Sequence, residues 1–343
     1  MNSHNPISAR KDDHIRINLE ENVQSGISTG LEKYSFEHNA LPEIDFEDID
    51  TSQFIFGKRI NAPILISSMT GGADLATRIN TVLAAAAQHS NIALGLGSQR
   101  AALELPELQK TFKIRQVAPN ILLFANVGAV QLNYEKNYVD FCQRAIDMVG
   151  ADALYLHLNP LQEALQPEGD VHFAGLLKKI EKVTHTLSVP VLIKEVGWGI
   201  SAKVAEMLVQ VGVAGIDVAG AGGTSWSQVE MFRMNDIHKA HVASAFKNWG
   251  IPTAESLVRV KRTVPNALIF ASGGINNGVD IAKCIALGAN MVGMAGPFLK
   301  AALVSEEETI ETITELIMGL KISMFATGAK DLAALTQIEL RKI

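Results

Sequence analysis

The sequence has few of the features that mark secreted, disulfide-bonded or nucleic-acid-binding proteins. Only two cysteines, Cys142 and Cys284, occur among 343 residues, and both lie in apolar helical contexts without metal-ligand spacing. This scarcity argues against a disulfide framework and fits a reducing cytoplasm. The formal net charge is −6 and no long Lys/Arg block is present, which excludes a general nucleic-acid binder.

Long apolar runs are also missing. The longest, such as NALIFASGGI at residues 266–275, are far too short to span a bilayer. Residues 1–8 are polar and lack the apolar stretch of a secretory signal. Because apolar residues still make up 48% of the chain and charged residues only 19%, a sizeable core is available. We therefore predict a folded cytoplasmic protein with no membrane partner.

From residue 61 onward the chain repeats one unit: a short apolar run, a polar or glycine-containing turn, and a segment with helical apolar spacing. Helices are predicted, for example, at Leu75–His89, Tyr138–Val149 and Ser201–Val211. The strands are apolar throughout, which is typical of strands covered by helices on both faces. Eight strands are predicted, at Ile64–Met69, Ile92–Gly97, Ile121–Val127, Ala153–Leu158, Val191–Glu195, Gly215–Ala219, Leu268–Ser272 and Met291–Ala295.

A closed (β/α)8 TIM barrel and a doubly wound open sheet both satisfy this α/β pattern. The barrel is favoured because polar residues and glycines recur after nearly every strand and not at one switch point. Residues 1–60 are predicted to be an N-terminal extension that wraps the barrel, and residues 61–343 to form the barrel itself. Residues 224–253 are a long insertion after strand six, and such a loop is usually functional or contains its own helices.

The carboxyl ends of the strands are the working face of such barrels. These ends are enriched in Gly, Ser, Thr, Asn and Lys, as a planar ligand carrying a phosphate would require. SGGI at 272–275 and AGP at 295–297 follow strands seven and eight, where backbone N–H groups beside a helix N-terminus commonly bind phosphate. Either motif alone is equally compatible with a tight turn; the two together favour phosphate.

Cationic and aromatic residues near these ends allow two interpretations each. Lys194 ends the strand PVLIK and either reaches solvent or places a cation against a ring that takes negative charge, such as reduced flavin. Arg10, Lys11 and Arg100 are solvated surface residues or, together, a positive field for a diphosphate. Trp226 is either a packing residue or, because it follows GAGGTS, a residue at the mouth of the site.

The segment LYLHLNPLQEALQPEGD, residues 154–170, begins as a buried strand and continues with polar groups that a core would not contain. His157 and Asn159 suit phosphate oxygens, and Glu163 suits a hard cation that prefers oxygen ligands. Gln162 supplies a neutral amide beside them. A polar loop would explain the two prolines but not this density of donors and acceptors.

Taken together, RKDDHI, SSMTGG, GLGSQR, HLNPLQE, VAGAGGTSW, WGIPTAESL, SGGI and AGPFL resemble type 2 isopentenyl diphosphate isomerase, the flavin-dependent enzyme family. The similarity extends from about Arg10 to the last helices. HLNPLQE combined with SSMTGG is highly specific, whereas SGGI alone occurs in many phosphate-binding barrels. The resemblance implies a TIM barrel that uses FMN, Mg²⁺ and a reductant such as NADPH. It also implies a homo-oligomer, a tetramer or octamer, that interconverts isopentenyl and dimethylallyl diphosphate.

The resemblance assigns roles to individual residues. Gln162, His157 and Lys194 would be catalytic, and Glu163 would bind the metal. Two positions depart from the pattern, with Ala219 where Ser is frequent and Asn276 where Arg is frequent. Substrate contacts are implied for Arg10, Lys11, His14, Ser98, Gln99, Arg100, His157, Asn159, Gln162 and Trp226. FMN contacts are implied for Ser68, Met69, Thr70, Ser98, Asn126, Lys194, Thr224, Gly273, Gly274, Ala295 and Gly296.

Arg10 and Lys11 are expected to be disordered without substrate and to fold over the diphosphate as a lid when it binds. No Glu/Asp acid–base pair is evident at the strand ends, so reduced flavin is the best candidate to carry the proton. The alternative activity is that of an FMN-dependent 2-hydroxy-acid oxidoreductase. Such enzymes need a His and an Arg near the end of strand six, where this chain has AGAGGTSW. A third possibility is a barrel that binds ligand without catalysis.

Overall fold

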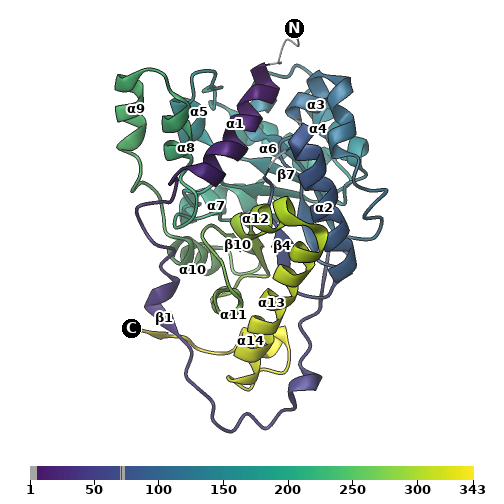
Figure 1. Cartoon of the computed structure of the whole chain (residues 1–343), viewed down its shortest axis with the longest axis vertical. Coiled ribbons are helices and arrows are strands. Elements are labelled where there is room, and N and C mark those ends of the chain that lie inside the picture. Colours follow the sequence, from purple (N-terminus) through teal and green to yellow (C-terminus); the bar gives the residue numbers. More distant parts are fainter. Residues whose placement is uncertain (1–5, 70, 72–73) are drawn as a thin grey trace.

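A computed structural model describes residues 6–69, 71 and 74–343, and its centre is a closed barrel of eight parallel strands (Figure 1). Each strand pairs with the next along the chain, and β11 pairs with β4 to close the barrel. The TIM-barrel prediction is confirmed and the doubly wound alternative is wrong. The strands are β4 (Ile64–Ile66), β5 (Ala93–Gly95), β6 (Leu123–Gly128), β7 (Ala153–His157), β8 (Val191–Lys194), β9 (Gly215–Asp217), β10 (Leu268–Ser272) and β11 (Met291–Met294).

The helices surround the barrel because each has one apolar face. In α4, for example, Phe141, Cys142, Ala145, Ile146 and Val149 are buried at helical spacing. The helices that follow strands are α2 (Asp74–Ser90), α3 (Arg100–Glu104), α4 (Tyr138–Val149), α5 (Pro160–Leu165), α6 (Leu176–Thr186), α7 (Ala202–Gln210), α10 (Thr253–Thr263), α11 (Gly278–Ala286), α12 (Gly296–Val304), α13 (Glu306–Phe325) and α14 (Leu332–Leu335).

Both cysteines belong to this helical layer. Cys142 in α4 and Cys284 in α11 are buried free thiols. Burial raises the pKa of Cys142 to about 12 and that of Cys284 still further, so both stay protonated and unreactive. Among the described residues, no helix combines the length and apolar character needed to cross a bilayer.

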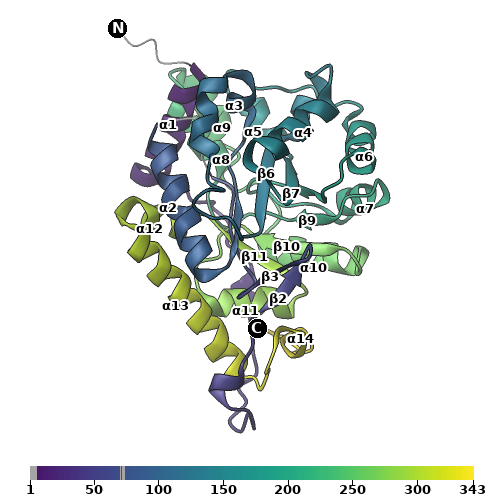
Figure 2. The ribbon, with the colours of Figure 1, turned by 90° about the vertical axis from the view of Figure 1, so that its right-hand side faces the viewer.

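The amino ends of the barrel strands are covered by a hairpin of β2 (Gln53–Ile55) and β3 (Lys58–Ile60), which Figure 2 shows on the side of the barrel away from α1 (Pro6–Glu20). Ile55 and Ile60 of this hairpin pack into the barrel interior against Leu65 and Phe124. A short pairing of β1 (Tyr34–Ser35) with β12 (Arg341–Lys342) joins the two terminal regions of the chain. The interior is therefore closed at this end.

The opposite end carries α1 and the insertion after β9. As predicted, the insertion contains its own helices, α8 (Trp226–Arg233) and α9 (Ile237–Ser244). Helix α1 lies against α8, and Ile17 and Val23 pack with Val229 in a small separate cluster. Because α8 belongs to the segment that leaves the carboxyl end of β9, this packing fixes α1 over the carboxyl ends of the strands.

Candidate active site

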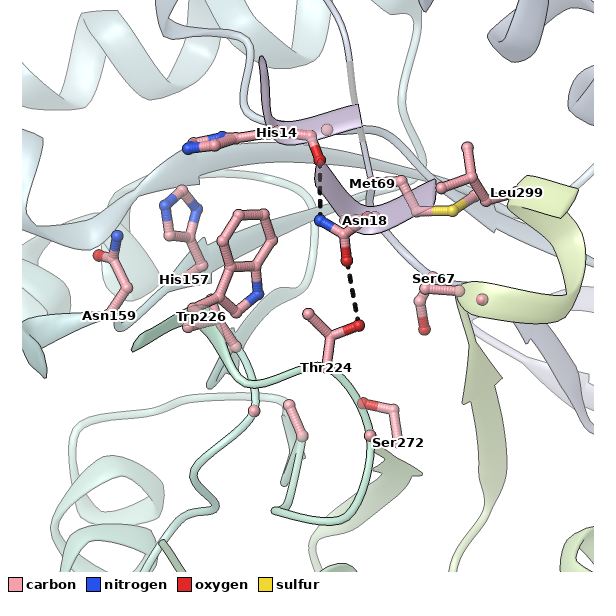
Figure 3. Close-up of a pocket in the computed structure, with 18 of the residues that line it drawn as sticks. His14, Asn18, Ser67, Met69, His157, Asn159, Thr224, Trp226, Ser272 and Leu299 are labelled. Atoms are coloured by element: carbon pink, nitrogen blue, oxygen red, sulfur yellow. Dashed lines mark hydrogen bonds between the residues drawn. The ribbon is translucent and has the colours of Figure 1, made fainter. Parts of the chain in front are cut away.

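A cavity of about 770 Å³ opens at the carboxyl ends of the strands, beneath α1 (Figure 3). It is lined by residues from α1, from all eight strand ends and from α8 and α12. Thr70 lies outside the described residues. The sequence-predicted residues that line the cavity are Arg10, Lys11, His14, Ser68, Met69, Ser98, Arg100, Asn126, His157, Asn159, Gln162, Glu163, Lys194, Thr224, Trp226, Gly273, Gly274, Ala295 and Gly296.

Gln99 is the one described residue for which the predicted placement is wrong. Its side chain is fully buried away from the cavity, and its Nε2 donates to the carbonyl of Ala145 in α4 at 2.8 Å. Its Oε1 accepts from the backbone N–H of Asn126 at 2.8 Å. The chain turns into α3 at this point, so Ser98 and Arg100 face the cavity while Gln99 joins the barrel to α4.

The floor of the cavity is a polar layer inside the barrel. Residues two apart along a strand point to the same side, so the polar layer sits directly above the apolar interior. Below it lie Leu65, Phe124, Tyr155, Leu192 and Phe270. The next inward positions toward the carboxyl ends are Ser67, Asn126, His157, Lys194, Asp217 and Ser272. Asp217, Ser67 and Ser272 are site residues that the sequence analysis missed, although the period-two alternation marks them.

His157 is held as a neutral imidazole. Asn126 donates its Nδ2 to the carbonyl of Leu96 at 2.9 Å, which turns its Oδ1 toward His157 Nδ1 at 2.8 Å. This network assigns the proton to Nδ1 and leaves Nε2 for the cavity. Burial first, and then the charges of Lys194 and Lys11, lower the pKa of His157 to about 3. An anion placed at Nε2 would favour the protonated ring.

Lys194 ends β8 with only 7% of its surface exposed, and it lines the cavity. Its Nζ donates to the carbonyl of Glu195 at 2.6 Å. Burial lowers the pKa of Lys194, while the charges of Asp217 and Glu195 raise it. The carboxylate of Glu195 faces away and accepts from the backbone N–H groups of Val196, Gly197 and Trp198.

Helix α5 and the residue before it carry the polar group predicted from HLNPLQE. Asn159 Nδ2 donates to Glu163 Oε1 at 2.8 Å and to Gln162 Oε1 at 3.1 Å. The other oxygen of Glu163 accepts from Gln166 Nε2 at 2.5 Å and from the N–H of Asp170 at 2.7 Å. Asn159 Oδ1 is buried without a partner in the part of the chain that the structure describes. These bonds aim one carboxylate and one free amide oxygen at the cavity.

Glu163 is not joined by other metal-binding side chains. Within residues 6–69, 71 and 74–343, no group of three or more His, Cys, Asp or Glu side chains converges. Mg²⁺ commonly binds through one or two carboxylates together with substrate phosphates and water. A single carboxylate at Glu163 therefore suits a magnesium ion that arrives with a diphosphate.

Helix α1 reaches the site through Lys11 and His14. The expected disorder of Arg10 and Lys11 is not found, because both lie in α1, and Lys11 Nζ donates to the carbonyl of Ser98 at 3.0 Å. Burial, then the charge of Arg10, lowers the pKa of Lys11 to about 7. The His14 ring meets Trp226 edge-on at 5.0 Å, and Asn18 links the His14 carbonyl to Thr224 (Figure 3).

Glu230 in α8 is a second carboxylate that the sequence analysis missed. It is fully buried and accepts from Gln162 Nε2 at 3.0 Å and Arg233 Nη1 at 2.6 Å, and it contacts His14 Nε2 at 3.1 Å. Burial raises its pKa, but the hydrogen bonds from His14 and Gln162 and the charge of Arg233 win and hold it at about 2. Glu230 therefore stays ionised and fixes the orientation of the Gln162 amide.

The backbone of the loop after β10 requires glycine at two positions. Gly273 and Gly274 have φ values of 106° and 75°, a region that favours glycine. A Cβ at either position would also collide with the backbone of Gly220 or Gly222. The N-terminus of α12 adjoins this loop, since Ala295 and Gly296 line the same cavity. Asn276 Nδ2 donates to the carbonyl of Gly274 at 2.9 Å and so braces the loop.

Arg100 also faces the cavity, but it is paired. Its guanidinium contacts Asp170 Oδ2 at 2.5 Å and Glu104 Oε1 at 2.7 Å. Asp170 in turn accepts from Gln131 and donates its backbone N–H to Glu163. Arg100 and Glu163 therefore belong to one network on the side of the cavity formed by β5, β6 and β7.

Comparison with known proteins first defines the class. Residues 162–342 match the family model described as FMN-dependent dehydrogenase. Mandelate oxidase with (S)-2-phenylpropionate and mandelate oxidase with 3,3-difluoro-2-hydroxy-3-phenylpropionic acid have the same fold. Each superimposes with a TM-score of 0.68 at 19% identity and covers 98% of both chains. At this identity the likeness shows the fold alone, and with the family model it defines an FMN-dependent α/β barrel.

Closer relatives then specify the family. A protein of Rickettsia bellii named isopentenyl-diphosphate delta-isomerase is 53% identical over 332 residues, covering 97% of each chain. One of the same name from Nostoc sp. is 53% identical over 326 residues, covering 94% of this chain and 93% of its own. The chain belongs to the isopentenyl-diphosphate delta-isomerase family, and the resemblance drawn from its motifs is confirmed.

Proposed function

We propose that the protein interconverts isopentenyl diphosphate and dimethylallyl diphosphate, using FMN, Mg²⁺ and a reductant such as NADPH. The observation that carries this proposal is the convergence of Lys194, the Gly273–Gly274 loop and the Asn159–Glu163 group on one cavity. The relatives at 53% identity support the activity. We further propose that residues 1–60 are an extension whose α1 serves as the substrate lid over the barrel of residues 61–343.

The cavity fits FMN. Its volume of about 770 Å³ lies within the range of small-molecule sites, roughly 300–1,000 Å³. The loop of Gly273 and Gly274 beside the N-terminus of α12 suits the phosphate. The hydroxyls of Ser67 and Ser68 are buried without a partner among the described residues, so they are available to a ligand. Lys300 of α12 lines the cavity near Asn276 and supplies a cation that Asn276 does not.

Lys194 would lie against the edge of the flavin ring that becomes negative on reduction. A buried cation stabilises that charge strongly because little water screens it. FMN supplies, when bound and reduced, a nitrogen that holds and releases a proton. Lys194 contributes the positive field, and Asn126, Ser68 and Thr224 contribute polar contacts around the ring.

The diphosphate would bind on the opposite side of the cavity from the glycine loop. Lys11, Arg10 and Arg100 supply cations, and His157 Nε2 becomes a donor when the ring takes up a proton, which the negative charge of the diphosphate favours. Glu163 would hold Mg²⁺ together with the phosphate oxygens. The pairing of Arg100 with Asp170 leaves Lys11, which has no carboxylate partner in the described contacts, as the most available cation.

The hydrocarbon end of the substrate would then lie near Gln162 and Trp226. Moving the double bond by one carbon requires that one carbon gains a proton and another loses one. Glu230 is ionised but fully buried behind Gln162, so it orients the amide and does not line the cavity. His14 and Trp226 close the mouth and exclude water from a carbocation-like transition state.

The alternative activity, oxidation of a 2-hydroxy acid, is favoured by the fold that mandelate oxidase shares and by the match to the FMN-dependent dehydrogenase family model. Reductant use separates the two activities. Purified protein should contain FMN, be bleached by NADPH or dithionite, and then convert isopentenyl diphosphate when Mg²⁺ is present. Bleaching of the oxidised flavin by a 2-hydroxy acid, without NADPH, would support the oxidoreductase. Failure of the reduced, magnesium-loaded protein to convert the substrate would overturn the proposal.

A further inference from the structure

Asp217 is a fully buried carboxylate that the proposed mechanism does not use. It ends β9 at the position paired with Lys194 on β8, so both side chains belong to the same inward layer of the barrel. Lys194 lines the cavity, whereas Asp217 lies beneath it and does not. The carboxylate is thus beside the lysine but out of reach of a ligand in the cavity.

Burial raises the pKa of Asp217, and the charge of Lys194 together with two hydrogen bonds opposes that rise. Its Oδ1 accepts from the hydroxyl of Ser272 at 2.6 Å and from the N–H of Ala219 at 3.2 Å. Its Oδ2 is buried and has no hydrogen-bond partner among the described residues. A buried carboxylate that keeps one oxygen unpaired needs a nearby cation, because an isolated charge in this environment is strongly unfavourable. Lys194 is the neighbour that supplies it.

Among the neighbours of Lys194, Asp217 raises the pKa of the lysine more than Glu195 does. The carboxylate of Glu195 turns to three backbone N–H groups, and burial raises its pKa to about 7. His157 on β7 is neutral, and Tyr155, one layer below, has its pKa raised well above the usual value by burial. Asp217 is therefore the carboxylate of this layer whose charge most favours protonation of Lys194.

We propose that Asp217 is the counter-ion that keeps Lys194 protonated under the flavin, and thereby fixes how many protons bound FMN takes up on reduction. This inference rests on the proposed function, which places Lys194 at the flavin. Asp217 is a positioning residue, since it acts through Lys194 and touches neither substrate nor cofactor. Without it, burial would leave Lys194 neutral in the oxidised protein, and reduction would bring in a proton for it.

The proton count is measured by the pH dependence of the midpoint potential of bound FMN between pH 7.5 and 9.5, with dithionite as electron donor. Reduction of FMN to its anionic reduced form takes up two electrons and one proton. The equilibrium constant of this reaction therefore changes tenfold per pH unit, which shifts the midpoint potential by about 30 mV. Wild type should show this slope because Lys194 is already protonated. In Asp217→Asn the slope should double to about 60 mV per pH unit, since Lys194 then gains a proton as well.

Two variants serve as controls. Asp147→Asn removes an exposed carboxylate from α4 and should behave as wild type. In the double variant Lys194→Met with Asp217→Asn, the slope should return to one proton, because the group that takes up the second proton is gone. This dependence on Lys194 separates an electrostatic role of Asp217 from a merely structural one.

Several outcomes overturn the inference. A one-proton slope in folded, FMN-loaded Asp217→Asn would show that Lys194 does not need this carboxylate. A two-proton slope in wild type would show that Asp217 does not keep Lys194 protonated in the oxidised protein. That measurement tests the inference even if the variant fails to fold. If instead Lys194→Met alone leaves both the affinity for FMN and its potential unchanged, the placement of Lys194 at the flavin is wrong and the proposed function loses that residue.

Discussion

Both ends of the barrel contain charged groups that are buried or partly buried, but their hydrogen bonding differs. At the amino end, Asp152 accepts from Lys58, Arg115 and the N–H of Leu123 at 2.7–2.9 Å. At the carboxyl end, Ser67, Ser68, Asn159 and Asp217 each keep a buried polar atom without a partner among the described residues. Since native proteins satisfy almost all buried polar groups, the unsatisfied end is the one arranged for a ligand.

The contrast also explains why the same residue type has different roles at the two ends. Lys58 donates to the carbonyl of Ile121 and to Asp152. Lys194 donates only to the carbonyl of Glu195 and faces an open cavity. A lysine at the closed end therefore stabilises the fold, whereas a lysine at the open end is available for chemistry.

The largest difference is expected between Lys194→Met and Lys58→Met, which remove one lysine from each end of the barrel. Lys194→Met should lower kcat by about 100- to 1,000-fold, the usual cost of removing one preorganised electrostatic contact. It should also lower the midpoint potential of FMN. Lys58→Met should leave both quantities unchanged and lower only stability. Equal effects of the two substitutions on the flavin potential would contradict the assignment of the flavin to the carboxyl end.

The next largest effect concerns the metal. Glu163→Gln should cost about 10- to 100-fold in activity or magnesium affinity, and excess Mg²⁺ should recover part of the loss. Glu168→Gln is the matched control, since it removes an exposed carboxylate of the same loop that does not line the cavity. Titration of activity with Mg²⁺ measures both. Wild-type activity of Glu163→Gln at low magnesium would show that Glu163 has a structural role and does not bind the metal.

Lys11→Ala should raise the KM for substrate by about 10- to 100-fold at pH 6, because a charge-assisted hydrogen bond contributes about 1.5–3 kcal/mol. The pKa of Lys11 is lowered to about 7 in the free protein, so its charge is lost as the pH rises through 7. The difference from wild type should accordingly shrink at pH 8.5. FMN affinity should not change, and the exposed Lys182→Ala should have no effect. A pH-independent ratio of the two KM values would count against Lys11 as a cation of the lid.

The smallest effect on activity is expected at the closed end. Asp152→Asn leaves Lys58 and Arg115 with one charged partner fewer, which should lower the free energy of unfolding by about 1–3 kcal/mol. Since this cluster lies on the side of the barrel away from the cavity, kcat and the flavin potential should stay at wild-type values. Denaturant unfolding and steady-state kinetics on one preparation give both numbers. A changed flavin potential in Asp152→Asn would contradict the claim that the amino end of the barrel serves only stability.

The sequence predicted the barrel well because the signal is local. Uniformly apolar runs separated by helical periods identify strands covered on both faces, and all eight were placed; only their ends differ. The direction of a side chain beyond the end of a strand is harder to predict from the local sequence. Gln99 stands between two cavity residues in GSQR, yet it points outward because the chain has already turned into α3.

The parts of the site that the sequence did not reveal depend on tertiary contacts. Glu230 reaches Gln162 only because α8 packs beside α5, and Asp217 meets Lys194 only through the pairing of β8 with β9. The position of α1 likewise depends on the packing of Ile17 and Val23 against Val229 of α8, which the local composition does not reveal.

The most direct test counts turnovers per reductant. One equivalent of dithionite or NADPH is added to the anaerobic, magnesium-loaded protein in deuterated water, and product is followed with excess isopentenyl diphosphate. The account predicts many turnovers per equivalent, with deuterium in the carbon that becomes a methyl group, because the reaction has no net redox change. One product per reductant equivalent, or product without deuterium at that carbon, would contradict it.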